Sequence, residues 1–201
     1  MNKLRFRYII YSSRRFYVTE FSIRLLNCKT EREATDRFTC GNSTIDRMVK
    51  NSHYPTALQH AYAYEVSYRG LVLGYYMLKF LQHSIEDDAW PTSISEYSSD
   101  TIKDFSTVYI QYIAVDKNMQ GQQIGTQILR FIIKEINKLS KLWPVRMVSL
   151  NALPDKVEWY QKNGFALYEG VSPLTELGGD NRYMYLDLID DVEILSRNFG
   201  M

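Results

Sequence analysis

The sequence predicts an α+β fold in which a mixed central sheet of about six to seven strands is flanked by helices. Short aromatic and β-branched runs in the first half are typical of strands. The second half alternates strand, amphipathic helix, strand, short helix and strand. A length of 201 residues with 45% hydrophobic residues suits a single domain with a full core.

The first half is expected to contain strands and one helix. Residues 40–43 (Cys-Gly-Asn-Ser) offer a turn with a capping residue before a helix. Arg69-Gly70 separates two strand-like runs and predicts a hairpin turn. The expected elements are a strand at 21–26, a helix at 43–52 and hairpin strands at 61–66 and 71–81, with irregular polar segments at 27–39 and 82–105.

The second half begins with an apolar and aromatic run of strand length at residues 107–115. A glycine-containing turn follows, and apolar residues then recur at steps of three and four from Ile124 to Leu139, which predicts an amphipathic helix. Gly164 is placed to end a short helix. The other expected elements are a strand at 145–150, a short helix at 154–163 and a last strand at 182–188.

Charge is distributed unevenly along the chain. Residues 1–19 contain five basic and no acidic residues, whereas the rest has 19 basic and 23 acidic residues. We therefore divide the chain into a basic N-terminal extension, 1–19, and a domain, 20–201. The extension could contact RNA or a membrane, or could be a solvated arm. The domain lacks the concentrated positive charge of a nucleic-acid binder.

Several classes of protein are not expected. No apolar run reaches the roughly 20 residues that a membrane-spanning helix needs, and the N-terminus lacks a signal-peptide pattern. These observations predict a cytoplasmic protein with no membrane partner. Cys28 and Cys40 are expected to be free thiols, and three scattered histidines predict no metal site.

The segment from Val115 to Thr126 carries the strongest functional signal. A strand runs into a turn and then into a helix N-terminus, whose unpaired N–H groups and positive dipole end favour an anion. Gly121 and Gly125 lack the Cβ atoms that would keep a phosphate from the backbone. An ordinary strand-to-helix connection can carry the same glycines, so these residues alone leave both interpretations open.

Two motifs resemble the GNAT family of acetyltransferases. Gln120-x-x-Gln123-x-Gly125 is similar to the family signature Gln/Arg-x-x-Gly-x-Gly/Ala, and residues 151–165 resemble the family's Asn…Tyr…Gly-Phe segment. The resemblance implies a single GNAT-type domain whose sheet splays between the fourth and fifth strands. It also implies an N-acetyltransferase that moves an acetyl group from acetyl-CoA to a primary amine of a small molecule or protein.

The resemblance implies roles for particular residues. The pantetheine arm would pair with the end of the fourth strand like an added strand, and the Val115 N–H would stabilise the developing oxyanion. Tyr160 would act as general acid toward the leaving thiolate, and Asn151 would orient the cofactor or a water. The implied cofactor-binding residues are Ile113, Ala114, Val115, Gln120, Gly121, Gln122, Gln123, Gly125 and Thr126.

Two positions leave the chemistry open. Gln123 stands where the signature has glycine, and its N–H can still serve a phosphate if its φ is negative and helical. Its side chain could crowd the pyrophosphate or bind it, so a catalytically weak acetyl-CoA-binding domain is an alternative. The general base is not identified, and the acidic candidates by position are Glu65, Glu96, Asp100 and Asp104.

Residues 40–47 and 73–78 resemble segments of the GNAT toxins of bacterial toxin–antitoxin pairs. Such toxins acetylate the amino group of aminoacyl-tRNA and are neutralised by a small DNA-binding antitoxin. The acidic domain, and the absence of arginine from residues 111–113, rank a small-molecule or protein amine first and tRNA second. The sequence leaves a homodimer open.

Overall fold

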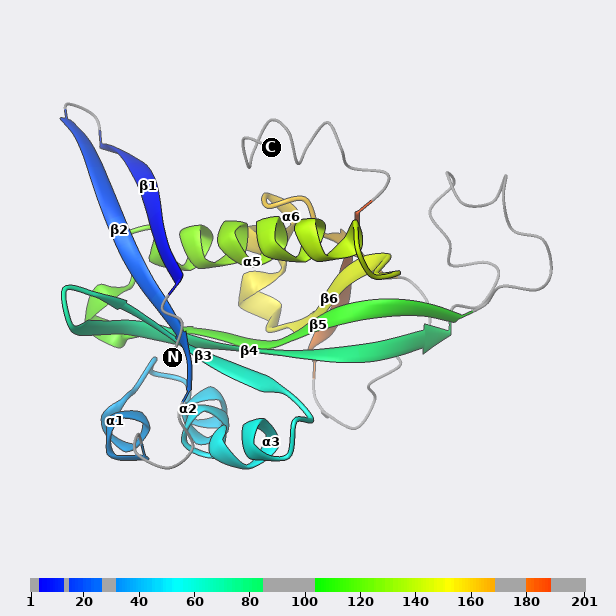
Figure 1. Cartoon of the computed structure of the whole chain (residues 1–201), viewed down its shortest axis with the longest axis horizontal. Helices are drawn as coiled ribbons and strands as arrows, with labels where there is room; N and C mark the ends of the chain where they lie inside the picture. The colour runs from blue at the N-terminus through cyan, green and yellow to red at the C-terminus, as the bar shows by residue number, and fades with distance from the viewer. Residues whose placement is uncertain (1–3, 13–14, 27–31, 85–103, 169–179, 189–201) are drawn as a thin grey trace. The chain divides into compact units, whose positions relative to one another are not determined.

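The computed structural model describes residues 4–12, 15–26, 32–84, 104–168 and 180–188 (Figure 1). The chain divides into two compact units. The first unit comprises residues 1–78 and 112–128, and the second comprises 79–111 and 129–201. Most of the irregular segment expected at 82–105 lies outside the described residues, together with Glu96 and Asp100.

In the first unit the strands follow the hydrogen-bonding order β1-β2-β3-β4-β5. The first three neighbouring pairs are antiparallel. Arg69 (φ 49°) and Gly70 (φ 86°) form the predicted β3–β4 turn, and two positive φ angles are what a two-residue hairpin needs. The strands are β1 Leu4–Ser12, β2 Arg15–Leu25, β3 Tyr62–Tyr68, β4 Leu71–Ser84 and β5 Asp104–Val115.

The N-terminal segment forms a hairpin. β1 pairs with β2 from Leu4↔Ile23 to Ser12↔Arg15. β2 runs without interruption across the boundary that we drew between residues 19 and 20. The basic extension is therefore continuous in secondary structure with the first strand that we predicted.

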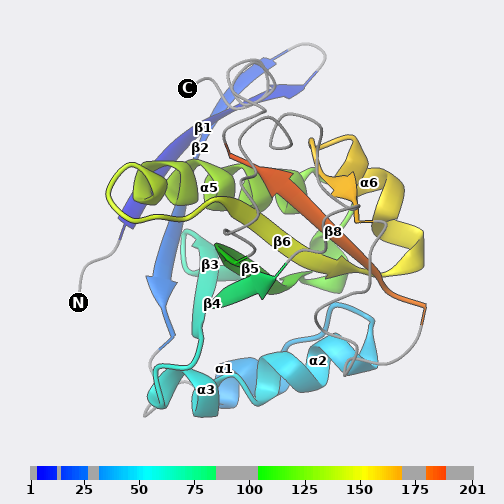
Figure 2. The same cartoon turned by 90° about the vertical axis from the view of Figure 1, so that its right-hand side faces the viewer.

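Three short helices lie on one face of β3 and β4 within the first unit (Figures 1 and 2). The Asn42 side chain caps α2 by accepting hydrogen bonds from the Thr44 and Ile45 N–H groups, each at 3.1 Å. The predicted helix at 43–52 ends earlier, and α1 arises where we expected irregular chain. The helices are α1 Arg32–Arg37, α2 Ser43–Lys50 and α3 His53–Ala57.

The second unit has the strand order β4-β5-β6-β8-β7. β5 pairs with β6 in parallel, which requires a crossover, and α5 supplies it. β6–β8 and β7–β8 are antiparallel, so the sheet is mixed and the predicted α+β class is confirmed. The elements are α5 Ile124–Ser140, β6 Met147–Ala152, α6 Val157–Gln161, β7 Ala166–Leu167 and β8 Arg182–Asp187.

The parallel ladder between β5 and β6 is short. It contains four pairs and ends at Ile110↔Leu150, although β5 continues to Val115 and β6 to Ala152, all of them described residues. β5 and β6 are the strands that we predicted as fourth and fifth. The last residues of β5 therefore lie beyond the ladder with β6, as a splayed sheet requires.

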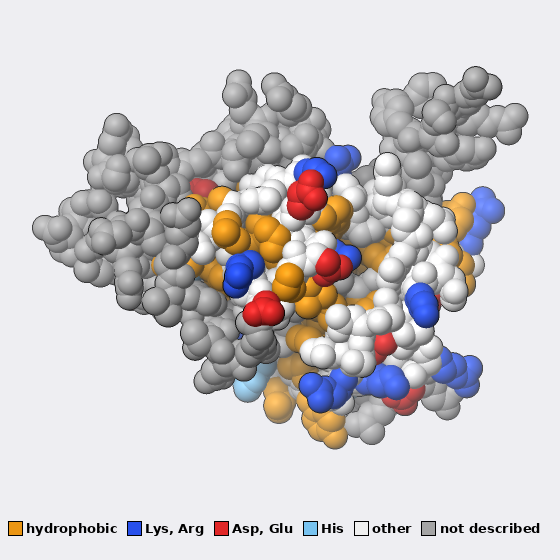
Figure 3. Space-filling model, turned by 180° about the vertical axis from the view of Figure 1, so that it is seen from behind, with side chains coloured by type: hydrophobic (Ala, Val, Ile, Leu, Met, Phe, Trp, Pro, Cys, Tyr) orange, Lys and Arg blue, Asp and Glu red, His pale blue; other side chains and the backbone are white. Residues whose placement is uncertain are grey.

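Charged side chains are present on the surface, and the described helices are short or polar by the standard of a membrane span. Figure 3 shows basic and acidic side chains interspersed with hydrophobic ones on the face that it draws. Among the described helices, none combines the length and the apolar character that crossing a bilayer demands.

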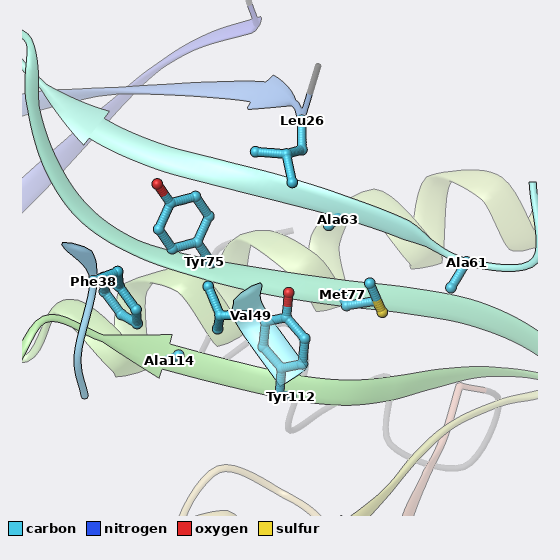
Figure 4. Packing of buried hydrophobic residues seen from close by; sticks show 9 residues of the cluster. All are labelled: Leu26, Phe38, Val49, Ala61, Ala63, Tyr75, Met77, Tyr112 and Ala114. Atoms are coloured by element: carbon cyan, nitrogen blue, oxygen red, sulfur yellow. The ribbon is translucent and has the colours of Figure 1, made fainter. Parts of the chain in front are cut away.

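The core of the first unit includes the last residues of β5. Figure 4 shows Tyr112 and Ala114 of β5 beside Tyr75 of β4 and helix-side residues. The rings of Phe38 and Tyr75 meet edge to face at 5.0 Å. The Tyr112 hydroxyl lies 2.5 Å from the Ser52 hydroxyl, so even the polar atom of this core side chain has a partner. The end of β5 is thereby fixed from one side.

Candidate active site

The donor turn, which we define as Asp116–Thr126, connects β5 to α5. The Asp116 N–H donates to Leu73 O at 2.9 Å and continues the pairing of β5 with β4. The Asp116 carboxylate then accepts from the Asn118 N–H at 2.9 Å and begins a single 3₁₀ turn, Lys117–Met119. The chain thus leaves the strand in a defined direction.

Two left-handed residues shape the rest of the donor turn. Gly121 has φ 77° and Gln123 has φ 60°. The negative, helical φ on which we made phosphate donation by the Gln123 N–H conditional is not observed, because this residue adopts the left-handed conformation that favours glycine. A Cβ at Gly121 would meet nothing within 4 Å, so backbone conformation, rather than crowding, accounts for this glycine.

These angles leave backbone donors open at the start of α5. The Gln123 carbonyl accepts from the Gln127 N–H at 3.1 Å and so starts the helix. Within the described part of the chain, the N–H groups of residues 121–123 make no hydrogen bond to protein, and these residues are exposed. Free N–H groups before a 17-residue helix suit a pyrophosphate, so the turn fits the donor that the sequence implies.

The end of β5 offers further backbone groups. The Ala114 carbonyl faces Gly74, where an added Cβ would come within 2.2 Å of its oxygen. Because strand groups alternate in direction, Ile113 and Val115 point their N–H groups away from β4. The structure thus favours Ile113 and Val115 over Ala114 among the three backbone contacts that we predicted.

The side chain of Gln120 faces protein. Its amide nitrogen donates to Cys40 O at 2.7 Å and to Val115 O at 3.1 Å. We had placed Gln120 among the cofactor-binding residues. Its observed contacts connect the donor turn to residues 40–42, hereafter the Cys-Gly-Asn segment, and to the end of β5.

The predicted catalytic side chains lie in the second unit. Tyr160 is on α6, and its ring meets Trp159 and Phe165 edge to face, with centroids 4.6 and 5.5 Å away. Burial, followed by the proximity of Tyr109, raises the pKa of Tyr160 above its usual value. Its phenol therefore stays protonated through the neutral range, as a general acid requires.

Tyr109 of β5 was missed by the sequence reasoning. Burial is the largest cause that raises the pKa of Tyr109, whereas hydrogen bonding by Asn151 lowers this pKa. Asn151 therefore lies beside the Tyr109 hydroxyl. The Lys79 ammonium lies 5.0 Å from the centre of the Tyr109 ring. We use the name aromatic group for the two tyrosines and the two polar residues considered with them: Tyr109, Tyr160, Lys79 and Asn151.

Of the carboxylates that we considered as bases, Glu65 and Asp104 are among the described residues, whereas Glu96 and Asp100 are not. Glu65 is buried, and both its oxygens accept from the Arg24 guanidinium, at 2.9 and 2.7 Å. A carboxylate held in this bidentate pair is poorly suited to accept a substrate proton. Asp104 is exposed at the start of β5. The base is unassigned among the described residues.

Comparison with known proteins shows which family this chain belongs to. The family model described as an acetyltransferase (GNAT) domain matches residues 59–167, which include the donor turn, Asn151 and Tyr160. The chain belongs to the GNAT acetyltransferase family. It is therefore an acyltransferase, as the two motifs predicted. No curated protein sequence matches it.

Solved structures with the same fold include several GNAT toxins. AtaT complexed with acetyl-methionyl-tRNAfMet has a TM-score of 0.71 and 19% identity, covering 87% of this chain and 98% of AtaT. AtaTR bound with acetyl-CoA has a TM-score of 0.67 and 20% identity, with 87% and 97% covered. A tyrosine-to-phenylalanine variant of KacT has a TM-score of 0.68 and 16% identity, with 84% and 95% covered.

Proposed function

We propose that this GNAT protein transfers the acetyl group of acetyl-CoA to a primary amine. The observation that carries the proposal is the donor turn, in which Gly121 and Gln123 expose backbone N–H groups ahead of α5. The AtaTR structure holds acetyl-CoA on the same fold, which supports this donor. Acetyl-CoA supplies an acetyl group activated as a thioester.

In the proposed reaction the acetyl group moves directly from the donor to the amine. The amine nitrogen attacks the thioester carbonyl, the C–S bond breaks, and the sulfur leaves as a thiolate. The Val115 N–H, pointing away from β4, is suited to donate to the oxygen that gains charge. Tyr160 then gives its phenolic proton to the thiolate, and the proton lost by the amine restores the phenol through solvent.

The acceptor that we favour is the amino group of an aminoacyl-tRNA. AtaT is similar in fold and has been solved with acetyl-methionyl-tRNAfMet, and residues 40–47 resemble the toxin segment. Arg37, Arg47, Lys50 and Lys117 are exposed in the first unit, where they could meet phosphates. The excess of acid over base in residues 20–201 favours a second candidate, a small cationic amine.

Release of CoA from acetyl-CoA tests both acceptors. Purified protein should release CoA with charged tRNA and not with deacylated tRNA or polyamines, and Gly125→Asp should abolish release by placing a carboxylate at the anion site. Release with polyamines alone would support the second candidate. Binding of acetyl-CoA in calorimetry without release with any acceptor would leave the catalytically weak binding domain as the function.

A further inference from the structure

The Cys-Gly-Asn segment and the donor turn are joined by hydrogen bonds within the first unit. The Lys117 N–H donates to Thr39 O at 2.9 Å, and Gln120 donates to Cys40 O at 2.7 Å. At Gly41, the position of an added Cβ lies 3.7 Å from the Lys117 side chain. Residues 39–41 therefore lie directly against the start of the donor turn.

Asp46 of α2 fixes this segment. One carboxylate oxygen accepts from the Cys40 N–H and the other from the Thr39 hydroxyl, both at 2.7 Å. The Thr39 hydroxyl oxygen in turn accepts from the Gly41 N–H at 3.1 Å. Burial acts to raise the pKa of Asp46, but the hydrogen bonds from Cys40 and Thr39 outweigh it and the pKa is lowered.

Gln120 carries the connection across to β5. A primary amide has two N–H hydrogens, and here two carbonyl oxygens, Cys40 O and Val115 O, accept them. No amide hydrogen is then left for a phosphate oxygen. The side chain holds the end of β5 and the Cys-Gly-Asn segment at fixed positions relative to the donor turn.

We propose that Gln120 and Asp46 are positioning residues for acetyl-CoA, acting together as one clamp on the donor turn. The inference rests on the proposed function, because the ligand of the turn is the donor proposed above. Asp46 acts through Cys40, and Gln120 acts through Cys40 and Val115. The clamp keeps the N–H groups of residues 121–123 directed at the pyrophosphate.

Asp46→Asn distinguishes the clamp from a purely electrostatic effect of Asp46 on acetyl-CoA affinity. Acetyl-CoA is a polyanion, so on charge alone removal of a carboxylate from the first unit strengthens binding. The clamp predicts the opposite, since Asn supplies one acceptor oxygen where two are used. We expect acetyl-CoA affinity in calorimetry to fall about fivefold. Asp36→Asn on α1 is the control, because it removes the same charge at an exposed position and, among the described residues, Asp36 has no hydrogen bond to Thr39, Cys40, Asp46 or Gln120; its affinity should not fall.

Gln120→Met tests the other end without changing charge. Affinity and KM for acetyl-CoA should worsen about tenfold, as two hydrogen bonds are lost. In the double variant with Asp46→Asn the losses should be less than additive, because both break one clamp. Additive losses, or an affinity unchanged in either single variant, would overturn the proposal.

Hydrogen exchange of residues 116–126 tests the clamp in the protein without ligand. Both variants should speed exchange in this segment and leave exchange in β6 and β8 unchanged. Unchanged exchange in the segment refutes the clamp whatever the binding result. If the wild-type protein binds no acetyl-CoA, the proposed function fails, and faster exchange in the variants would still support the clamp itself.

Discussion

The donor turn and the aromatic group are held by different kinds of interaction. The donor turn is fixed mainly by hydrogen bonds of its backbone and of Gln120. The aromatic group depends on ring packing, with Tyr160 between Trp159 and Phe165, and on burial around Tyr109. In the proposed function, the donor turn binds through main-chain groups, and the aromatic group acts through particular side-chain atoms.

This difference determines how each region responds to substitution. A backbone donor survives most side-chain changes and is lost only when the conformation of the chain shifts. A phenolic proton is lost with a single oxygen atom, although the packing around it remains. Effects on rate should therefore concentrate in the aromatic group, and effects on binding and stability in the donor turn and its supports.

The largest effect is expected from Tyr160→Phe. Loss of the phenolic proton should lower kcat at least about 100-fold, because the thiolate must leave without a general acid. Acetyl-CoA affinity and Tm should stay near wild type, since the ring and its contacts with Trp159 and Phe165 are kept. Steady-state CoA release and calorimetry measure the two quantities. Tyr62→Phe, at an exposed position on β3, is the control.

The pH dependence of kcat checks the same role. Because the pKa of Tyr160 is raised, the phenol remains protonated beyond its ordinary titration near about 10. Activity that requires the protonated phenol is therefore kept as pH rises and is lost only above that value. A wild-type kcat that falls between pH 8 and 9, with the fall absent in Tyr160→Phe, would contradict the raised pKa of Tyr160; the same fall kept in Tyr160→Phe would assign it to another group.

Gly74→Ala should give the largest loss of stability around the donor turn. The new Cβ would come within 2.2 Å of the Ala114 carbonyl oxygen, which is backbone and can move only with β5. We expect about 3 kcal/mol of destabilisation, a fall in Tm of about 6–12 °C, and weaker acetyl-CoA binding. Leu71→Ala, at an exposed position on the same strand, should change Tm far less. Equal Tm values for the two variants would refute the close packing of β4 on β5.

Local patterns in the sequence were sufficient for most of the fold. The period of three and four after Ile124 predicted α5, and Arg69-Gly70 predicted a turn whose two φ angles are positive. The hairpin of β1 with β2 was missed because basic residues at 1–19 suggested a solvated arm. The short helix α1 was missed because residues 27–39 have no apolar period.

The supports of the site could not be predicted in the same way. The bond from Gln120 to Cys40 joins residues 80 apart, and no local pattern fixes such a contact. The contact of Asn151 with Tyr109 likewise depends on the register of β5 with β6. The signature motifs predicted which residues form the site. Contacts between distant segments determined that the Gln120 amide bonds to protein.

Gln123→Gly, for which we expect the smallest effect, tests the left-handed conformation of Gln123. A φ of 60° costs a residue with a Cβ about 1–2 kcal/mol, and glycine avoids this cost while losing more chain entropy on folding. The net result should be a gain of about 0.5–1 kcal/mol in the free energy of unfolding, with acetyl-CoA affinity unchanged within about threefold. Gln122→Gly is the matched control, because Gln122 has no positive φ and glycine there should only destabilise. Opposite shifts in Tm would establish Gln123 as a strained substitute for glycine, whereas affinity more than tenfold weaker in Gln123→Gly would make its side chain a ligand of acetyl-CoA.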